Sequence, residues 1–151
     1  MHNVTCERKD AGYLLTVILP KFAQAHWEEV GQDKSWEPDP NVEAYHQLES
    51  DGNLYVLALM VDGEPEGYFI GILAPSLHYR SKLLMVSDMF YVSQEFRAKY
   101  AIRLFRAAEA MAADAGADKM FITYKLYKNV EPIMRRLRFT PLEQVAAKKL
   151  R

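Results

Sequence analysis

The chain has 151 residues, half of them hydrophobic and 26% charged, and 19 basic against 20 acidic residues give a formal net charge of -1. This length predicts a single domain, residues 1–151, with one core. The near-neutral charge argues against nucleic acid or an anionic membrane as a partner, and the lone Cys6 excludes an internal disulfide and a cysteine-based zinc site.

The N-terminal part predicts a short strand followed by two helices. Residues 2–7 favour the strand, and Asp10 can cap the first helix, in which Pro20 predicts a bend or break. Residues 31–40 contain two prolines and predict a surface loop. Asp39, followed by a proline, is an N-cap signal for the second helix.

Three strands are expected next. Residues 53–60 and 67–73 are rich in β-forming types and flank an Asp-Gly turn, so they predict an antiparallel hairpin. Residues 82–92 form a long apolar run with two polar interruptions, which suits a central strand buried on both faces.

The C-terminal part predicts helix, strand, helix and strand. An Ala-rich helix runs from about Tyr100 to Gly116, and residues 119–126 form the next strand. Residues 130–137 predict a short helix and residues 141–150 a last, more polar strand. A helix that joins two strands of one sheet makes a right-handed crossover, so strands 82–92 and 119–126 should run parallel.

This order of elements resembles the GNAT superfamily of acyltransferases. The resemblance rests also on V-x-x-x-x-R-x-K, from Val92 through Arg97 to Lys99, and on a short helix that leads to the aromatic Phe139. It covers nearly the whole chain and is densest over residues 85–139. It implies an α/β (α+β) fold with a mixed, mostly antiparallel sheet of six to seven strands, strands four and five parallel and splayed, and helices on both faces.

The resemblance also implies acetyl-CoA as cosubstrate. In that family the turn after strand four reads Q/R-x-x-G-x-G/A and holds the pyrophosphate, and no alignment of this chain restores a glycine there. A loop that turns into a helix still presents free amides to an anion. The implied binding positions are the strand edge at Phe90, Tyr91 and Val92 for pantetheine, and Arg97, Ala98, Lys99, Tyr100, Ala101 and Ile102 for the pyrophosphate.

Acetyl transfer to an amine needs a base and a proton donor for the departing thiolate. Asp88 lies close to where the family often has a carboxylate base, and burial there would favour its protonated form; the alternative is that it satisfies a local hydrogen bond. The family's usual acid tyrosine corresponds to Met134. Tyr124 and Tyr127 are the nearest substitutes, with packing as their alternative role.

Two functions are therefore open. The first is an N-acyltransferase with an acyl-CoA and an amine acceptor as partners. The second is a GNAT-fold protein that has lost catalysis, because the loop glycines are absent and Arg138 stands where the family has glycine. The lost glycines also give the chain a likeness to small acyltransferase-like proteins of bacteriophages, some of them associated with virions.

Location, metal binding and assembly follow from simpler features. The N-terminus lacks the pattern of a signal peptide, so we expect a cytoplasmic protein, in the host cytoplasm if phage-encoded. His46 and His78 lack spaced metal-ligating partners, so no metal site is expected. An exposed last strand could pair two copies as a homodimer, although Lys148 and Lys149 oppose edge pairing.

Overall fold

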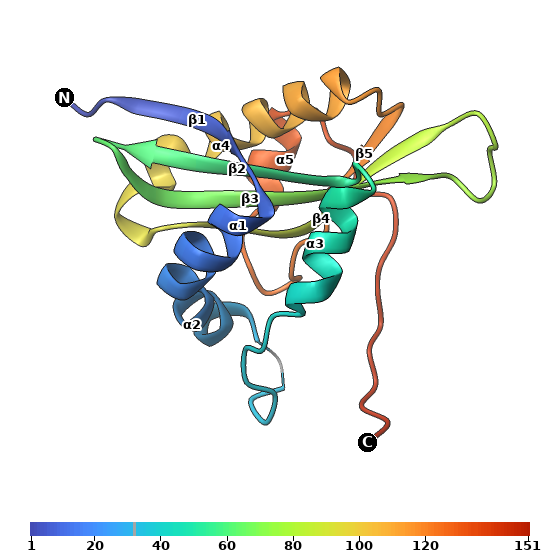
Figure 1. The fold of residues 1–151 in the computed structure, drawn as a ribbon, viewed down its shortest axis with the longest axis horizontal. Coiled ribbons are helices and arrows are strands. Elements are labelled where there is room, and N and C mark those ends of the chain that lie inside the picture. Colours follow the sequence, from blue (N-terminus) through green and yellow to red (C-terminus); the bar gives the residue numbers. More distant parts are fainter. Residues whose placement is uncertain (32) are drawn as a thin grey trace.

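Five strands form one sheet in the computed structural model, which describes residues 1–31 and 33–151 (Figure 1). The strands lie in the order β1-β2-β3-β4-β5. In chain order the elements are β1 (Val4–Lys9), α1 (Ala11–Tyr13), the π-helical turn η1 (Leu14–Ile18), α2 (Leu19–Val30), α3 (Val42–Ser50), β2 (Leu54–Val61), β3 (Glu64–Pro75), β4 (Leu83–Val92), α4 (Gln94–Asp114), β5 (Lys119–Phe121) and α5 (Glu131–Arg136).

The predicted fold class is confirmed. Strands β1 to β4 pair antiparallel with their neighbours, and β4 pairs parallel with β5 across the crossover helix α4. The sheet has five strands, fewer than the six to seven implied by the resemblance. The missing strand is the one predicted for residues 141–150.

Helices cover both faces of the sheet (Figure 1). Alternate residues of β2 explain this, since Val56 and Ala58 pack against α1, η1 and α2, while Leu57 and Leu59 pack with α4 and α5 on the other side. A strand that is buried on both faces needs a continuous apolar run, which β2 has. The sheet is therefore the middle of three layers, with helices packed on each of its faces.

Local sequence signals account for most element boundaries. Asp62 and Gly63 have positive φ angles of 51° and 88°, the turn geometry that joins β2 and β3 tightly. The side chain of Asp10 accepts a hydrogen bond of 2.7 Å from the amide of Tyr13, so the predicted cap is confirmed. Pro20 lies in the first turn of α2, directly after η1, where the helix adapts to its missing N–H group.

The loop between α2 and α3 has no helix or strand over residues 33–41. This agrees with the loop predicted for residues 31–40, of which Gln32 lies outside the described residues. The cap of α3 is Asn41, whose side chain accepts from the amide of Ala44, and not Asp39 as predicted. Asn41 directly precedes the first helical residue, where a side-chain oxygen reaches the free amides.

The structure corrects two predicted boundaries and one predicted strand. Helix α4 begins at Gln94 and not near Tyr100, so the loop between β4 and α4 shrinks to Ser93. Strand β5 ends at Phe121. Residues 140–151 are almost entirely exposed and form no strand, since their apolar residues do not alternate with the period of two that a half-buried strand needs.

None of the helices in the described part of the chain is long and apolar enough to cross a membrane.

Candidate active site

A wedge opens between β4 and the segment that follows β5. The two strands pair only from Leu84 with Lys119 to Val86 with Phe121. The last link across them is the hydroxyl of Ser87, which accepts a 2.9 Å hydrogen bond from the amide of Thr123. Beyond it, β4 has no strand partner on this side among the residues that the structure describes. The predicted splay of the two strands is confirmed.

A β-bulge marks the start of the wedge. Ile70 of β3 pairs with Met89, but Gly71 pairs with Ser87, so Asp88 is the extra residue of β4. A bulge re-aims a side chain, and the Asp88 carboxylate accepts a hydrogen bond of 2.7 Å from the hydroxyl of Tyr45 on α3. Asp88 is exposed, so the expected burial is wrong. An exposed carboxylate can meet a substrate directly.

Backbone groups of β4 line the open side of the wedge. The amide of Ser93 donates to the carbonyl of Glu66 and so continues the ladder with β3. Because successive residues of an antiparallel strand turn to opposite sides, Phe90 and Val92 direct their backbone groups into the wedge. Tyr91 directs its own backbone groups toward β3. Of the three residues predicted to form the strand edge for pantetheine, only Phe90 and Val92 therefore present backbone groups to the wedge.

The start of α4 lies at the mouth of the wedge. The amides of Phe96 and Arg97 both donate to the carbonyl of Ser93, at 3.0 Å each. The amides of Gln94 and Glu95 precede the helix hydrogen-bonding pattern and point outward with the positive end of the helix dipole. This is where an anion finds free backbone donors.

The predicted pyrophosphate positions beyond Arg97 lie inside α4. From Ala98 to Ile102 the amides belong to the helix ladder, which leaves them no free N–H group for an anion. Ala98 and Lys99 are exposed and Ala101 is buried, while the Tyr100 ring stacks on the ring of Phe96 with a centroid distance of 6.1 Å. Binding through the side chain of Lys99 stays a prediction.

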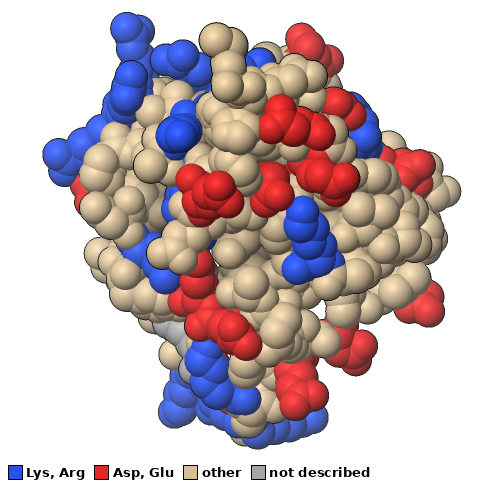
Figure 2. Space-filling view, turned by 90° about the vertical axis from the view of Figure 1, so that its left-hand side faces the viewer, with Lys and Arg blue, Asp and Glu red and all other residues tan. Residues whose placement is uncertain are grey.

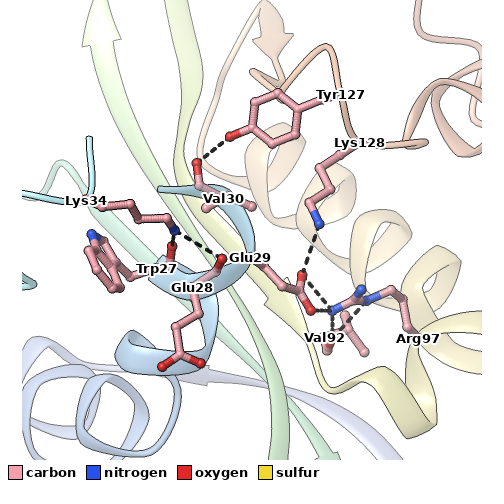
Figure 3. Close-up of polar contacts among 9 residues, drawn as sticks. All are labelled: Trp27, Glu28, Glu29, Val30, Lys34, Val92, Arg97, Tyr127 and Lys128. Carbon is pink, nitrogen blue, oxygen red and sulfur yellow. Dashed lines mark hydrogen bonds and ion pairs between the residues drawn. The ribbon is translucent and has the colours of Figure 1, made fainter. Parts of the chain in front are cut away.

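Three charged side chains meet at this mouth (Figure 3). The guanidinium of Arg97 donates to the Val92 carbonyl at 2.9 and 3.1 Å. It also contacts both carboxylate oxygens of Glu29, near the end of α2, at 2.8 and 3.1 Å. Lys128 lies 4.0 Å from the same carboxylate. The Arg97 side chain that was predicted to bind phosphate therefore already holds an anion.

A histidine of α2 contacts a tyrosine of β3. The ring nitrogen Nδ1 of His26 is 2.6 Å from the hydroxyl of Tyr68, which is fully buried. Burial lowers the pKa of His26; Glu29 opposes this shift, and Arg97 and Lys125 add to it. Burial, with the nearby Asp88 and Tyr91, raises the pKa of Tyr68. The pair is therefore neutral near pH 7.

The two predicted acid tyrosines lie on the other wall of the wedge. Tyr124 is half-buried and packs against the core formed with α4 and α5. Tyr127 donates its hydroxyl to the carbonyl of Val30 at the end of α2 (Figure 3). In the part of the chain that the structure describes, neither hydroxyl forms a hydrogen bond with Asp88.

Sequence reasoning missed His26, Glu29 and Tyr45. Each stands in a helix where its spacing is typical of an ordinary surface or core position. Each reaches the site through a contact with a residue far away in the sequence. The separations are 42 positions for His26, 68 for Glu29 and 43 for Tyr45. Only the fold brings such residues together.

Charge over this side of the molecule is mixed. Figure 2 shows acidic side chains gathered near the centre of the face, with basic side chains bordering them. No group of three or more His, Cys, Asp or Glu residues that could hold a metal ion occurs within residues 1–31 and 33–151. An anionic ligand would therefore depend on local donors such as Arg97.

The lowered pKa of His26 predicts how stability depends on pH. Below the ordinary value of about 6.5 the unfolded chain binds a proton at His26 more readily than the folded one, so the free energy of unfolding falls as the pH drops. We expect His26→Gln to lose this dependence in urea unfolding between pH 5 and 8. His46→Gln, at an exposed position, should keep the wild-type slope; equal slopes for the two variants would contradict the prediction.

Comparison with known proteins adds to this geometry. No family model matches the chain, and no curated protein matches it in sequence. Among solved structures, the aminoglycoside acetyltransferase meta-AAC0020 from an uncultured soil metagenomic sample, in complex with sisomicin, has a TM-score of 0.74 at 17% identity over 98% of this chain and 95% of that one. This chain has an acetyltransferase fold.

Two further structures agree with that fold. The aminoglycoside N-acetyltransferase AAC(6')-Iy in complex with CoA has a TM-score of 0.73 at 14% identity, over 100% of this chain and 97% of that one. The ribosomal-protein-alanine N-acetyltransferase of Brucella melitensis biovar Abortus 2308 has a TM-score of 0.67 at 14% identity, over 99% of each chain. Identities this low show a shared fold alone.

Proposed function

We propose that this protein is an acetyl-CoA-dependent N-acetyltransferase that acts on a primary amine by direct attack. The observation that carries the proposal is the wedge beside the bulged strand β4, in a fold shared with CoA-bound AAC(6')-Iy. Acetyl-CoA, when bound, supplies an activated thioester. The residues of this chain supply binding, orientation and proton transfer.

The wedge fits a pantetheine arm. Such an arm carries amides that pair with a strand edge as a further strand would. The N–H and C=O groups of Phe90 and the N–H group of Val92 face the wedge, while the carbonyl of Val92 is taken by Arg97. The outward amides of Gln94 and Glu95 and the Arg97 guanidinium would hold the diphosphate.

Asp88 is the proposed base. It takes the proton of the attacking amine while the nitrogen forms a bond with the acyl carbon and the carbon–sulfur bond breaks. The thiolate leaves with the electron pair of that bond and takes a proton from an acid, for which Tyr124 is the candidate. Tyr45, which donates to Asp88 at 2.7 Å, orients the carboxylate. The Tyr127 hydroxyl is engaged with Val30 and is the weaker candidate for the acid.

A second candidate function is a binding protein of the same fold without catalysis. The observation that favours it is the ion pair of Arg97 with Glu29, which occupies the main cation of the phosphate site. The likeness to bacteriophage proteins stays a prediction under either function. A homodimeric state also stays a prediction, although the last strand expected to pair two copies does not form.

Ligand-dependent melting separates the two functions. A ligand at a hundred times its dissociation constant stabilises a protein by about 2.7 kcal/mol, so saturating acetyl-CoA should raise the melting temperature clearly. Release of CoA would then be followed with a panel of primary amines that includes an aminoglycoside and a peptide with N-terminal alanine. A shift without CoA release would favour the binding protein, and no shift would contradict the enzyme.

A further inference from the structure

The end of α2 is tied to both walls of the wedge (Figure 3). Glu29 contacts Arg97 on α4 and lies 4.0 Å from Lys128, which follows β5. One residue further, the carbonyl of Val30 accepts from the hydroxyl of Tyr127. The last turn of α2 therefore spans the mouth of the wedge from one wall to the other.

A carboxylate is poorly placed at the end of a helix. The C-terminal end of α2 carries the negative end of the helix dipole, which disfavours a second negative charge. Lys34 already satisfies the carbonyls of Trp27 and Glu28 at 3.1 and 3.2 Å. The position of the Glu29 carboxylate is thus favoured by Arg97 and Lys128 and not by its own helix.

Arg97 is oriented before any ligand arrives. Its contacts with the Val92 carbonyl fix the plane of the guanidinium. Its Nη2 group also contacts both oxygens of the Glu29 carboxylate, and a guanidinium donates hydrogen bonds to phosphate oxygens as it does to carboxylate oxygens. With Lys128 on the other side, the carboxylate occupies a small anion site between the two walls.

We propose that Arg97 and Lys128 are the two cations of the diphosphate site, and that Glu29 fills this site in cis until an acyl-CoA displaces it. This inference rests on the proposed function for the identity of the ligand. The exchange is a competition between two anions for one pair of cations. Removing the charge of Glu29 should therefore strengthen binding of any diphosphate, with or without a thioester.

Glu29→Gln tests the competition, and Glu28→Gln is its matched control. Glu28 is the preceding residue of the same helix, is exposed, and contacts the amide of Gln24 at 3.0 Å. The two variants change the net charge equally. Calorimetric titration with inorganic pyrophosphate and with CoA should show about fivefold tighter binding of both probes to Glu29→Gln, as expected for loss of a partly exposed ion pair. Glu28→Gln should match the wild type.

Lys128→Gln provides a second test of the competition in the same titrations. This variant should bind both probes severalfold more weakly, since one of the two cations is lost. The competition is overturned if the probes bind equally to the wild type and to the Glu29 and Lys128 variants, and the proposed function then still stands. If pyrophosphate tightens in Glu29→Gln while CoA binds to no variant, the competition holds and the proposed function fails. Binding of neither probe to any variant overturns both.

Discussion

Replacing Asp88 by asparagine should lower kcat by about 10²- to 10⁴-fold, the contribution of a positioned general base. The asparagine keeps the size of the side chain and can still accept a hydrogen bond from Tyr45, but it cannot take a proton from the amine. Binding of acetyl-CoA should change little, because Asp88 lies on the α3 side of β4 while the wedge is lined by the backbone of Phe90 and Val92. Steady-state kinetics of CoA release with a saturating amine would measure the loss.

Two further variants show whether the loss of kcat in Asp88→Asn is specific to this carboxylate. Asp114→Asn removes an exposed carboxylate at the end of α4 and should leave kcat unchanged. Tyr45→Phe removes only the hydrogen bond to Asp88 and should lower kcat less than Asp88→Asn does. Wild-type kcat in Asp88→Asn would exclude Asp88 as the base.

The fold was largely predictable because its strongest signals are local. The Asp-Gly turn after β2, the cap at Asp10 and the stop at Gly116, with a φ of 88°, each act within a few residues. Because α4 makes a right-handed crossover between them, β4 and β5 had to run parallel. What failed was the start of α4, although Ser93 followed by Glu95 is a typical N-terminal signal. The expected start was near Tyr100 because the Ala-rich run of strong helix formers begins there.

The site was predictable only where it lies along one strand. Asp88, Phe90 and Val92 belong to β4, so a strand with a bulge was enough to place them together. Glu29 carries no signal of its own, because a glutamate near the end of an amphipathic helix is an ordinary solvated residue. Its role appears only when the fold brings the end of α2 within reach of the start of α4, so that an ion pair forms between residues 68 positions apart in the sequence.

The helix behind the wedge provides the largest expected effect on stability. Phe105 on α4 is 4% exposed, and its ring meets that of Phe90 at 5.0 Å in an edge-to-face contact. Phe105→Ala should lower the free energy of unfolding by about 3–5 kcal/mol, through lost burial and the cavity left behind. Urea unfolding would measure this, with an unchanged m-value if the unfolded state stays the same.

Arg106→Ala is the matched control, since it changes the next residue of the same helix on its exposed side and should stay within about 0.5 kcal/mol of the wild type. A loss below about 1 kcal/mol in Phe105→Ala would contradict the packing described for α4. The same contact fixes Phe90, whose backbone lines the wedge. Phe105→Ala should therefore also weaken acetyl-CoA binding at temperatures where the variant is still folded, because a strand edge that shifts no longer matches the amides of the ligand.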